Sequence, residues 1–271
     1  MFTYVFIDWE NAEKTAKQNF GSVINYEEFN IVVRDIAQHN GSSLVGIKAF
    51  GDFDKGNAGL MSRLVNLGIE PHHVVTKTAR EYLKGSVDIA MSIEILKTMY
   101  TYPHISRFVF VSGDGDLRYV MRELKINGKL VDLLGFEKHT NKFIINMSNS
   151  FFSLDIYPKI LRKVSKSEKE KMIQSIMYDD GVRIVITKLH RLEQGSKSFI
   201  GLNYLRSKLS SSYEERVVEL SDSITKCIDC DVLETYKVNN PKDPSHPTKA
   251  CKLNKDNIVV QRVLSAKSNG E

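Results

Sequence analysis

The sequence predicts an α/β fold for its first 160 residues, with helices in layers on either side of a mostly parallel central sheet. The spacing of apolar residues leads to this prediction. Short apolar runs alternate with stretches whose apolar residues recur at helical spacing, which is the pattern of parallel strands joined by crossover helices. The chain is also long enough for two domains, and the polar stretch SKSEKEK at 165–171 is expected to be a linker or an exposed first helical turn between domains at 1–160 and 166–271.

Five strands and four helices are expected in the first domain. The strands are expected at Thr3–Asp8, Leu44–Phe50, Pro71–Thr76, Arg107–Ser112 and Lys129–Leu134. The helices are expected at Glu27–His39, Asn57–Leu67, Val87–Tyr100 and Leu117–Asn127, with Gly41, Gly68 and Gly128 as stop signals. A strand order of 3-2-1-4-5 would make the first and fourth strands neighbours, so that the loops leaving their carboxyl ends meet.

The second domain is expected to be a smaller helical, winged-helix-like module. Four helices are expected at 172–180, 182–194, 201–209 and 217–230. Two β-rich runs, at 231–238 and 257–264, flank the turn-rich stretch 239–250 and resemble a hairpin with a long tip. Helices followed by such a hairpin predict a winged helix-turn-helix, which binds nucleic acid or a protein partner.

The charge distribution favours a polyanionic partner for this second domain. Residues 1–160 hold 18 basic and 18 acidic side chains, whereas residues 161–271 hold 20 and 15 and therefore carry the whole net charge of +5. The chain has no apolar run of membrane-spanning length and no signal-peptide pattern at its start, which predicts a cytoplasmic protein. Three cysteines are too few for a disulfide framework.

The clearest chemical signal is the segment from Ser112 to Asp116, SGDGD, between an apolar strand and a helix. Two carboxylates on a glycine-rich turn repel each other unless a cation or strong donors compensate. The helix start behind them adds partial positive charge and free N–H groups. Alternatively, Asp114 or Asp116 simply caps the helix.

Two further acids are expected at the same edge of the sheet. Asp8 ends the first strand, and Asp88 begins the third helix. Each has a simpler explanation, because Asp8 could cap the next segment and Asp88 could interact with the helix dipole. The four acids together predict a metal site, and oxygen ligands without histidine or cysteine favour Mg²⁺ or Mn²⁺. Such an ion would activate a water for phosphodiester hydrolysis.

Four motifs in order resemble the NYN domain family, whose members are PIN-like nucleases. The motifs are IDWEN at 7–11, GD at 51–52, KGSVD at 84–88 and SGDGD at 112–116, and the resemblance extends over residues 1 to about 155. It implies a three-layer fold and a metal-dependent (ribo)nuclease, a hydrolase with Asp8, Asp88, Asp114 and Asp116 as its catalytic and metal-binding acids. Asn11 would be a supporting polar residue. Where many relatives have a further aspartate, this chain has Glu94, which leaves the role of that position open.

Two other side chains are expected to contact substrate or water at this edge. Lys84 could steer a phosphate backbone toward the acids, and Ser112 could orient a bound water, although a solvated lysine and a serine bonded to backbone are the simpler interpretations. The favoured hypothesis is an endonuclease acting on nucleic acid, RNA rather than DNA, with either a homodimer or a regulatory protein as a further partner. The alternatives are a non-catalytic binding module that uses the winged helix and a metal-dependent phosphatase.

Overall fold

The structure is a computed structural model that describes residues 1–53, 59–75, 85–195, 198–239 and 248–268. The described residues up to Val164 form one compact unit, unit 1, and those from Ser165 onward form a second, unit 2. Each unit has its own buried apolar core. Within the described part of the chain, no helix is long and apolar enough to cross a membrane.

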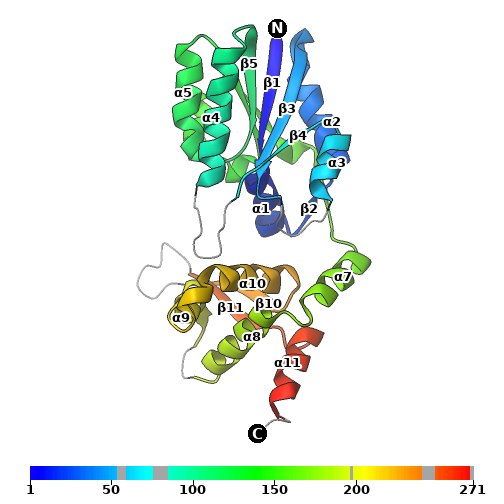
Figure 1. Cartoon of the computed structure of the whole chain (residues 1–271), viewed down its shortest axis with the longest axis vertical. Coiled ribbons are helices and arrows are strands. Elements are labelled where there is room, and N and C mark those ends of the chain that lie inside the picture. Colours follow the sequence, from blue (N-terminus) through cyan, green and yellow to red (C-terminus); the bar gives the residue numbers. More distant parts are fainter. Residues whose placement is uncertain (54–58, 76–84, 196–197, 240–247, 269–271) are drawn as a thin grey trace. The chain divides into compact units, whose positions relative to one another are not determined.

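Unit 1 is built on a six-stranded sheet in the order β4-β3-β1-β5-β6-β7, and each neighbouring pair of strands is parallel (Figure 1). The strands are β1 (Phe2–Asp8), β3 (Ser43–Gly51), β4 (Glu70–His73), β5 (Ile105–Val111), β6 (Leu130–Gly135) and β7 (Ser150–Ser153). The α/β prediction is confirmed, as is the predicted order of the first five strands. A short antiparallel pair, β2 (Val23–Ile24) and β8 (Leu161–Arg162), lies outside this sheet.

Helices cover both faces of the sheet in unit 1. They are α1 (Trp9–Phe20), α2 (Tyr26–Ala37), α3 (Leu60–Asn66), α4 (Ser86–Thr101), α5 (Arg118–Ile126) and the short α6 (Lys142–Met147). Alternate residues of a strand point to opposite faces: in β1, Val5 and Ile7 pack with α1, α2 and α3, whereas Phe6 packs with α4 and α5. Phe6 stacks against Phe50 and Phe108. This alternation produces the three layers.

The helix α1 was not predicted from the sequence, although both of its ends carry ordinary capping signals. Asp8 caps its first turn, and Gly21 ends it in the left-handed conformation that glycine adopts most easily. Its single tryptophan, Trp9, is buried between Tyr26 and Phe29. The helix therefore begins directly at the end of β1 and fixes the chain there.

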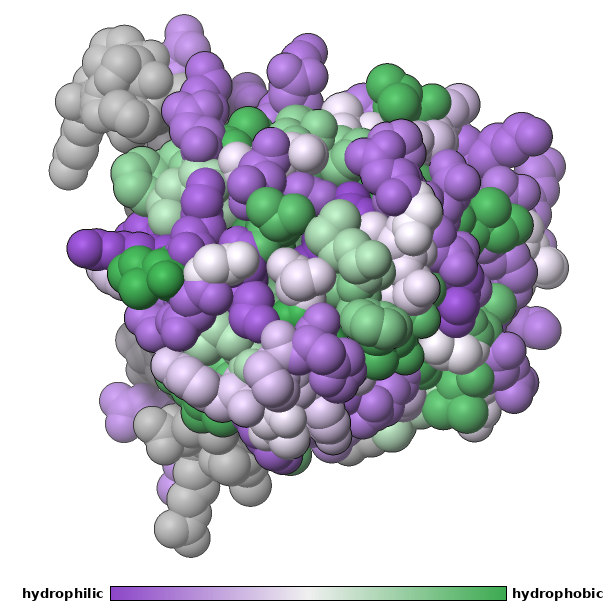
Figure 2. All heavy atoms as spheres, turned by 90° about the horizontal axis from the view of Figure 1, so that it is seen from above, coloured by the Kyte–Doolittle hydropathy of each residue, from purple (hydrophilic) through white to green (hydrophobic). Residues whose placement is uncertain are grey.

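The face of unit 1 at which β1 begins is largely hydrophilic. Viewed from that end, hydrophobic side chains lie in small groups separated by hydrophilic ones (Figure 2). The acids discussed below belong to the opposite ends of the strands, because Asp8 is the last residue of β1 and Ser112 follows the last residue of β5.

Among its described residues, unit 2 contains five α-helices and a three-stranded antiparallel sheet in the order β10-β11-β9. The elements are α7 (Lys166–Ile176), α8 (Asp180–Glu193), β9 (Ile200–Gly201), α9 (Leu202–Ser210), α10 (Val217–Asp229), β10 (Leu233–Val238), β11 (Thr248–Leu253) and α11 (Ile258–Ser268), within the described ranges. The stretch 165–171 begins α7 rather than forming a free linker, since Ser165 and Glu168 make a reciprocal capping box. All three cysteines are free thiols buried in this unit.

One expected strand of unit 2 is wrong. The run 257–264 is the start of α11, and the partner of β10 is β11, which lies partly within the stretch that was expected to be the hairpin tip. The side chain of Asn257 accepts the N–H of Val259, an interaction that starts a helix despite the β-branched residues that follow. Tertiary packing of Val259 and Val260 in the core then outweighs their preference for strands.

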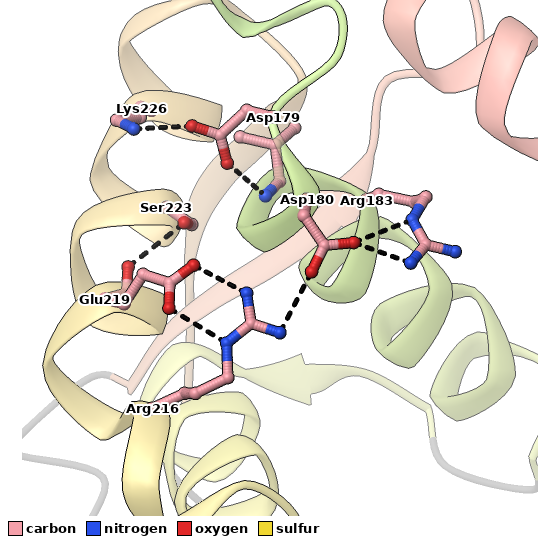
Figure 3. A network of polar contacts seen from close by, with 8 residues as sticks. Asp179, Asp180, Arg183, Arg216, Glu219, Ser223 and Lys226 are labelled. Carbon is pink, nitrogen blue, oxygen red and sulfur yellow. Dashed lines mark hydrogen bonds and ion pairs between the residues drawn. The ribbon is translucent and has the colours of Figure 1, made fainter.

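An ion-pair network joins the start of α8 to α10 (Figure 3). Asp179 caps α8 by accepting the N–H of Val182 and also pairs with Lys226, at 2.6 Å. Arg216 lies between Asp180, at 2.9 Å, and Glu219, at 2.6 Å. Each of these carboxylates therefore has a cationic partner in this unit.

Candidate functional site

Asp8 lies where three central strands of unit 1 end together. Because β1 runs parallel to both β3 and β5, their carboxyl ends lie at one edge of the sheet. The Asp8 side chain is only 4% exposed. It accepts the N–H of Asn11, at 3.0 Å, and the hydroxyl of Ser112, also at 3.0 Å. The capping interpretation of Asp8 is thus correct, and the residue also contacts the loop that follows β5.

Asn11 and Ser112 join the loops after β1 and β5. Ser112 donates to Asp8 and accepts the N–H of Asp114 at 3.1 Å, so its hydroxyl links the two acids. The side-chain oxygen of Asn11 accepts the N–H of Gly113 at 3.0 Å. The sequence led us to expect Asn11 as a supporting polar residue and Ser112 as a residue that orients a bound water. The structure places both between the loops after β1 and β5, and these roles stay predictions.

Gly113 allows this loop to approach the next one closely. A Cβ atom at this position would lie 2.4 Å from the carbonyl oxygen of His139, which is too close for any side chain. The carbonyl of Gly113 in turn accepts the N–H of Asn141 at 3.0 Å. The loop after β6 therefore holds the acidic loop in place from its other side.

Asp114 and Asp116 have different surroundings within the same turn. Asp114 is partly buried and accepts the N–H of Asp116 at 2.9 Å, whereas the side chain of Asp116 is exposed and pairs with Arg118 at 3.1 Å. The guanidinium of Arg118 also lies over the Tyr119 ring, 4.3 Å from its centre. Arg118 is a cation that the sequence interpretation did not identify, although only Leu117 separates it from the motif.

Asp88 joins the group from the first turn of α4. Burial, followed by repulsion from Asp114, Asp116 and Glu10, raises its pKa above the ordinary value. Burial also raises the pKa of Asp8, to about 7, and the charges of Asp88 and Asp114 add to this rise against the hydrogen bonds from Asn11 and Ser112. The structure therefore brings Asp8, Asp88, Asp114 and Asp116 within electrostatic range at one edge of the sheet.

Glu10 is a further acid at this edge that sequence reasoning did not single out. Its carboxylate accepts the N–H of Asp52 at 3.3 Å, and its charge contributes to the raised pKa of Asp88. The signal available in the sequence was its place in the first turn of a helix that begins at Asp8. Because that helix was not among the expected elements, the direction of Glu10 could not be inferred.

Two other positions that the sequence analysis named remain, Glu94 and Lys84. Glu94 is held by Lys48 of β3 at 2.5 Å, with its side chain largely buried, so this acid already has a cationic partner. Lys84, which was expected to contact substrate, is outside the described residues.

The acids do not form a ready-made metal cage. In the parts of the chain that the structure describes, no three histidine, cysteine, aspartate or glutamate side chains are placed to hold a metal ion together. Asp8, Asp114 and Asp116 instead accept hydrogen bonds from donors of the protein itself. Mg²⁺ does not need such a cage, since it commonly uses one or two carboxylates and keeps several waters.

A parallel α/β sheet with carboxylates gathered where its central strands end has the character of a PIN-like, nuclease-type domain. The family model of the NYN domain matches residues 2–155, so the chain belongs to the NYN domain family. A crystal structure of a protein of unknown function from Vibrio parahaemolyticus is similar, with 20% identity, a TM-score of 0.49, and coverage of 59% of this chain and 96% of that one. No curated protein matches the chain.

Proposed function

We propose that unit 1 is a metal-dependent endonuclease that hydrolyses phosphodiester bonds, with RNA as the preferred substrate. The observation that carries this proposal is the crowding of four aspartates. Within the part of the chain that the structure describes, Asp116 is the one member of this group that forms an ion pair with a lysine or arginine. Crowded carboxylates at a sheet edge cost stability unless a bound cation compensates them. Membership of the NYN domain family supports the same function.

The donor chemistry of Asp8, Asp88, Asp114 and Asp116 suits Mg²⁺ or Mn²⁺, with one or two of these carboxylates contacting the ion and the others reaching it through its bound waters. All four supply hard oxygen ligands, and the electrostatic repulsion at Asp8 and Asp88 is the kind that a divalent cation relieves. When bound, such an ion supplies an activated water and neutralises charge on the phosphate. The protein contributes a rigid arrangement of acids, because Ser112 fixes Asp8 relative to Asp114.

Asn11 is proposed to assist substrate positioning. Its side-chain oxygen is used by the N–H of Gly113, which leaves the amide nitrogen at the other end of the group to donate to a phosphate oxygen. Ser112 acts as a positioning residue by holding Asp8. Replacing a residue that orients a ligand commonly lowers activity by about 10–100-fold, which is the loss we expect for Ser112→Ala.

Incubation of the full chain with end-labelled single-stranded RNA and DNA of one sequence, with Mn²⁺ or with EDTA, tests the proposal. We expect metal-dependent cutting of RNA that is lost in Asp114→Asn, a substitution that keeps the oxygen acceptor for the N–H of Asp116. The matched control is Asp35→Asn on the exposed face of α2, which removes the same charge from unit 1 away from the acids. Intact RNA and DNA in all samples would favour the binding module, and cleavage of small phosphate esters alone would favour the phosphatase.

For unit 2, we propose a winged-helix module that contacts the nucleic-acid backbone through its β10–β11 hairpin. The succession of α8, β9, α9, α10 and the hairpin supports this proposal. Lys237 lies directly opposite Lys249 in the hairpin, and both are exposed. Two like charges that face each other are unfavourable unless an anion lies nearby. The helix α10, by contrast, carries three acidic residues and one lysine, so the hairpin is the better candidate for contact with phosphates.

Binding of the full chain to a labelled oligonucleotide at several salt concentrations tests the hairpin. Removing both lysines, with Lys237→Ala and Lys249→Ala, should reduce the slope of log K against log salt by roughly two, one per lost phosphate contact. The matched control removes two exposed lysines of α7, with Lys166→Ala and Lys171→Ala. An unchanged slope in the hairpin variant would contradict this part of the proposal.

A further inference from the structure

The outer side of α4 is unusually apolar for a surface helix. Its inner side buries Val87, Met91, Ile95 and Met99 against the sheet, as expected. Yet Ile89 and Ile93 are each 61% exposed on the opposite side, and Tyr100 is 65% exposed. A helix that is apolar on both sides is normally buried on both sides. The outer side of α4 is therefore a surface that lacks its expected cover.

The helix α5 extends this apolar surface. It packs beside α4 on the same side of the sheet (Figure 1). Its outward residues Tyr119 and Ile126 are 68% and 69% exposed. The hydroxyl of Tyr100 donates to Glu123 of α5 at 3.2 Å, which connects the two helices at their surface. We refer to Ile89, Ile93, Tyr100, Tyr119 and Ile126 as the α4–α5 face.

The size of the α4–α5 face is sufficient for a stable interface. A side chain of this size offers roughly 200 Å² when fully accessible, so five of them at these exposures present on the order of 600 Å² of apolar surface. A standard protein interface buries about 800 Å² on each partner. The apolar face and a polar rim around it therefore reach the area that a specific dimer requires.

The spacing along α4 matches a second copy of the same helix. Together with the partly buried Leu96, the outward apolar residues stand at 89, 93, 96 and 100, with separations of four, three and four. This is the a/d spacing of helices that pack at a small angle. The spacing is also the same in both directions, so two antiparallel copies related by a two-fold axis present matching stripes.

We propose that the protein forms a homodimer through the α4–α5 face, with the two α4 helices antiparallel. In this register Ile89 of one copy packs against Tyr100 of the partner subunit, and Ile93 packs against the partner subunit's Leu96. Charges on the face favour a copy of itself over a strongly charged partner, because the basic Lys97 and Arg122 are accompanied by the acidic Glu123. The dimer contains two acidic edges, one from each copy. Each edge lies beside the interface, because Asp88 directly precedes Ile89.

The molar mass of the full chain in solution tests the dimer. Sedimentation equilibrium at micromolar concentrations should give twice the chain mass of 30.9 kDa. The variant Ile93→Glu places a carboxylate near the two-fold axis in both copies and should weaken dimerisation on the order of a hundredfold or more. The matched control is Ile31→Glu on α2, where the isoleucine is 59% exposed on the other side of the sheet, and it should leave the dimer intact.

A pair of opposite charges tests the antiparallel register. Ile89→Glu alone and Tyr100→Lys alone should each weaken the dimer, whereas the two together should restore much of the affinity. Eleven residues of helix separate these positions by roughly 16 Å within one chain, so recovery must come from contact between copies. Ile89→Glu places a negative charge near the N-terminus of α4, and Tyr100→Lys places a positive charge near its C-terminus. The helix dipole favours both charges at these ends, so we expect both variants to fold.

Three outcomes would overturn the proposal. They are a monomeric wild-type protein at these concentrations, an Ile93→Glu variant that remains dimeric while folded, and a dimer broken equally by Ile31→Glu. A monomer that unfolds more easily after Ile93→Glu would show that another part of the same chain covers the face. Circular dichroism of each variant establishes that the loss of dimer is not a loss of fold.

Discussion

Both units of this protein gather several aspartates and glutamates in one place, but the partners of these acids differ. In unit 2, Asp179, Asp180 and Glu219 each contact a lysine or arginine (Figure 3). In unit 1, Asp8 and Asp88 lie near other acids. The pKa shifts have opposite directions: burial, with repulsion from neighbouring acids added to it, raises the pKa of Asp8 and Asp88, whereas in Asp179 the hydrogen bonds from Lys226 and Val182 outweigh burial and lower the pKa.

Burial acts to raise the pKa of all three carboxylates, so the comparison teaches that a cationic partner can reverse this effect and decide what the carboxylate does. A paired acid joins elements of the fold, and its ionised form is stable in the folded state. Crowded acids without cations make the folded state less stable and are retained where a ligand compensates them. Removing single acids from different settings should therefore change stability by different amounts and even with different signs.

The largest effect is expected for a paired acid that belongs to unit 1. Asp132 is buried and accepts a hydrogen bond from Arg107 at 2.6 Å, while Arg107 also donates to the carbonyls of Ala37 and Ile36 at the end of α2. Asp132→Asn leaves the arginine charge buried with a neutral neighbour. We expect a loss of about 3–5 kcal/mol in the free energy of unfolding, measured by urea titration of Trp9 fluorescence.

The control for this measurement is Asp35→Asn, whose exposed side chain on α2 should change stability by less than about 0.5 kcal/mol. If Asp132→Asn were equally mild, the partner of a carboxylate would not be what decides its effect in unit 1.

A moderate effect is expected at Asp179 of unit 2. Asp179→Ala removes the cap of α8 and the partner of Lys226 together. The expected loss is about 1–2 kcal/mol, measured by hydrogen exchange of peptides from α8. The neighbouring Asp180→Ala breaks only exposed ion pairs with Arg183 and Arg216 and should lose well under 1 kcal/mol.

The pH dependence of unit 2 should agree with this difference. Because the folded-state pKa of Asp179 lies below its ordinary value of 3.8, its ionised form stabilises the fold above that value. This stability is lost as the pH falls through the lower folded-state pKa. Wild-type α8 should therefore lose protection in acid, and Asp179→Ala should show a smaller loss over the same range.

The smallest effect is expected at Asp88 and has the opposite sign. In EDTA, Asp88→Asn removes one of the mutually repelling charges at the sheet edge and should raise the stability of unit 1. The gain should stay below about 1 kcal/mol, because the side chain is only half buried and solvent screens the repulsion. Mn²⁺ should then raise the melting temperature of the wild type more than that of the variant. A destabilised Asp88→Asn in EDTA would show that Asp88 serves the fold.

The sheet of unit 1 could be predicted from the sequence because its strands are continuous apolar runs. Buried strands such as β1 and β5 have apolar residues on both faces, and glycine marks the helix ends between them. The helix α1 was harder to identify because its sequence WENAEKTAKQNF is mostly polar, and only Trp9, Ala12 and Ala16 of it are buried. In unit 2, the β-branched residues at 258–260 favoured a strand, and only the cap at Asn257 indicated a helix.

The acids of the candidate site were also predictable, because each follows a strand or begins a helix at the same edge. Asn11 and Ser112 make contacts at this edge, but their roles toward substrate or water stay predictions, as do the catalytic and metal-binding roles of the acids. Sequence reasoning could not reveal that Lys48 holds Glu94 or that His139 packs against Gly113, since these pairs are far apart in the chain. Such contacts depend on how helices, strands and loops far apart in the sequence pack against one another.

The close packing at Gly113 limits how the acidic loop could be transplanted. The five-residue motif at 112–116 suggests a segment that could be moved to another protein by itself. However, the backbone of His139 fills the space beside Gly113, and the N–H of Asn141 donates to the Gly113 carbonyl. A graft onto another sheet would have to carry the loop after β6 as well. The transferable module is therefore two segments on neighbouring strands, and a search or a design that uses only the linear motif would omit half of it.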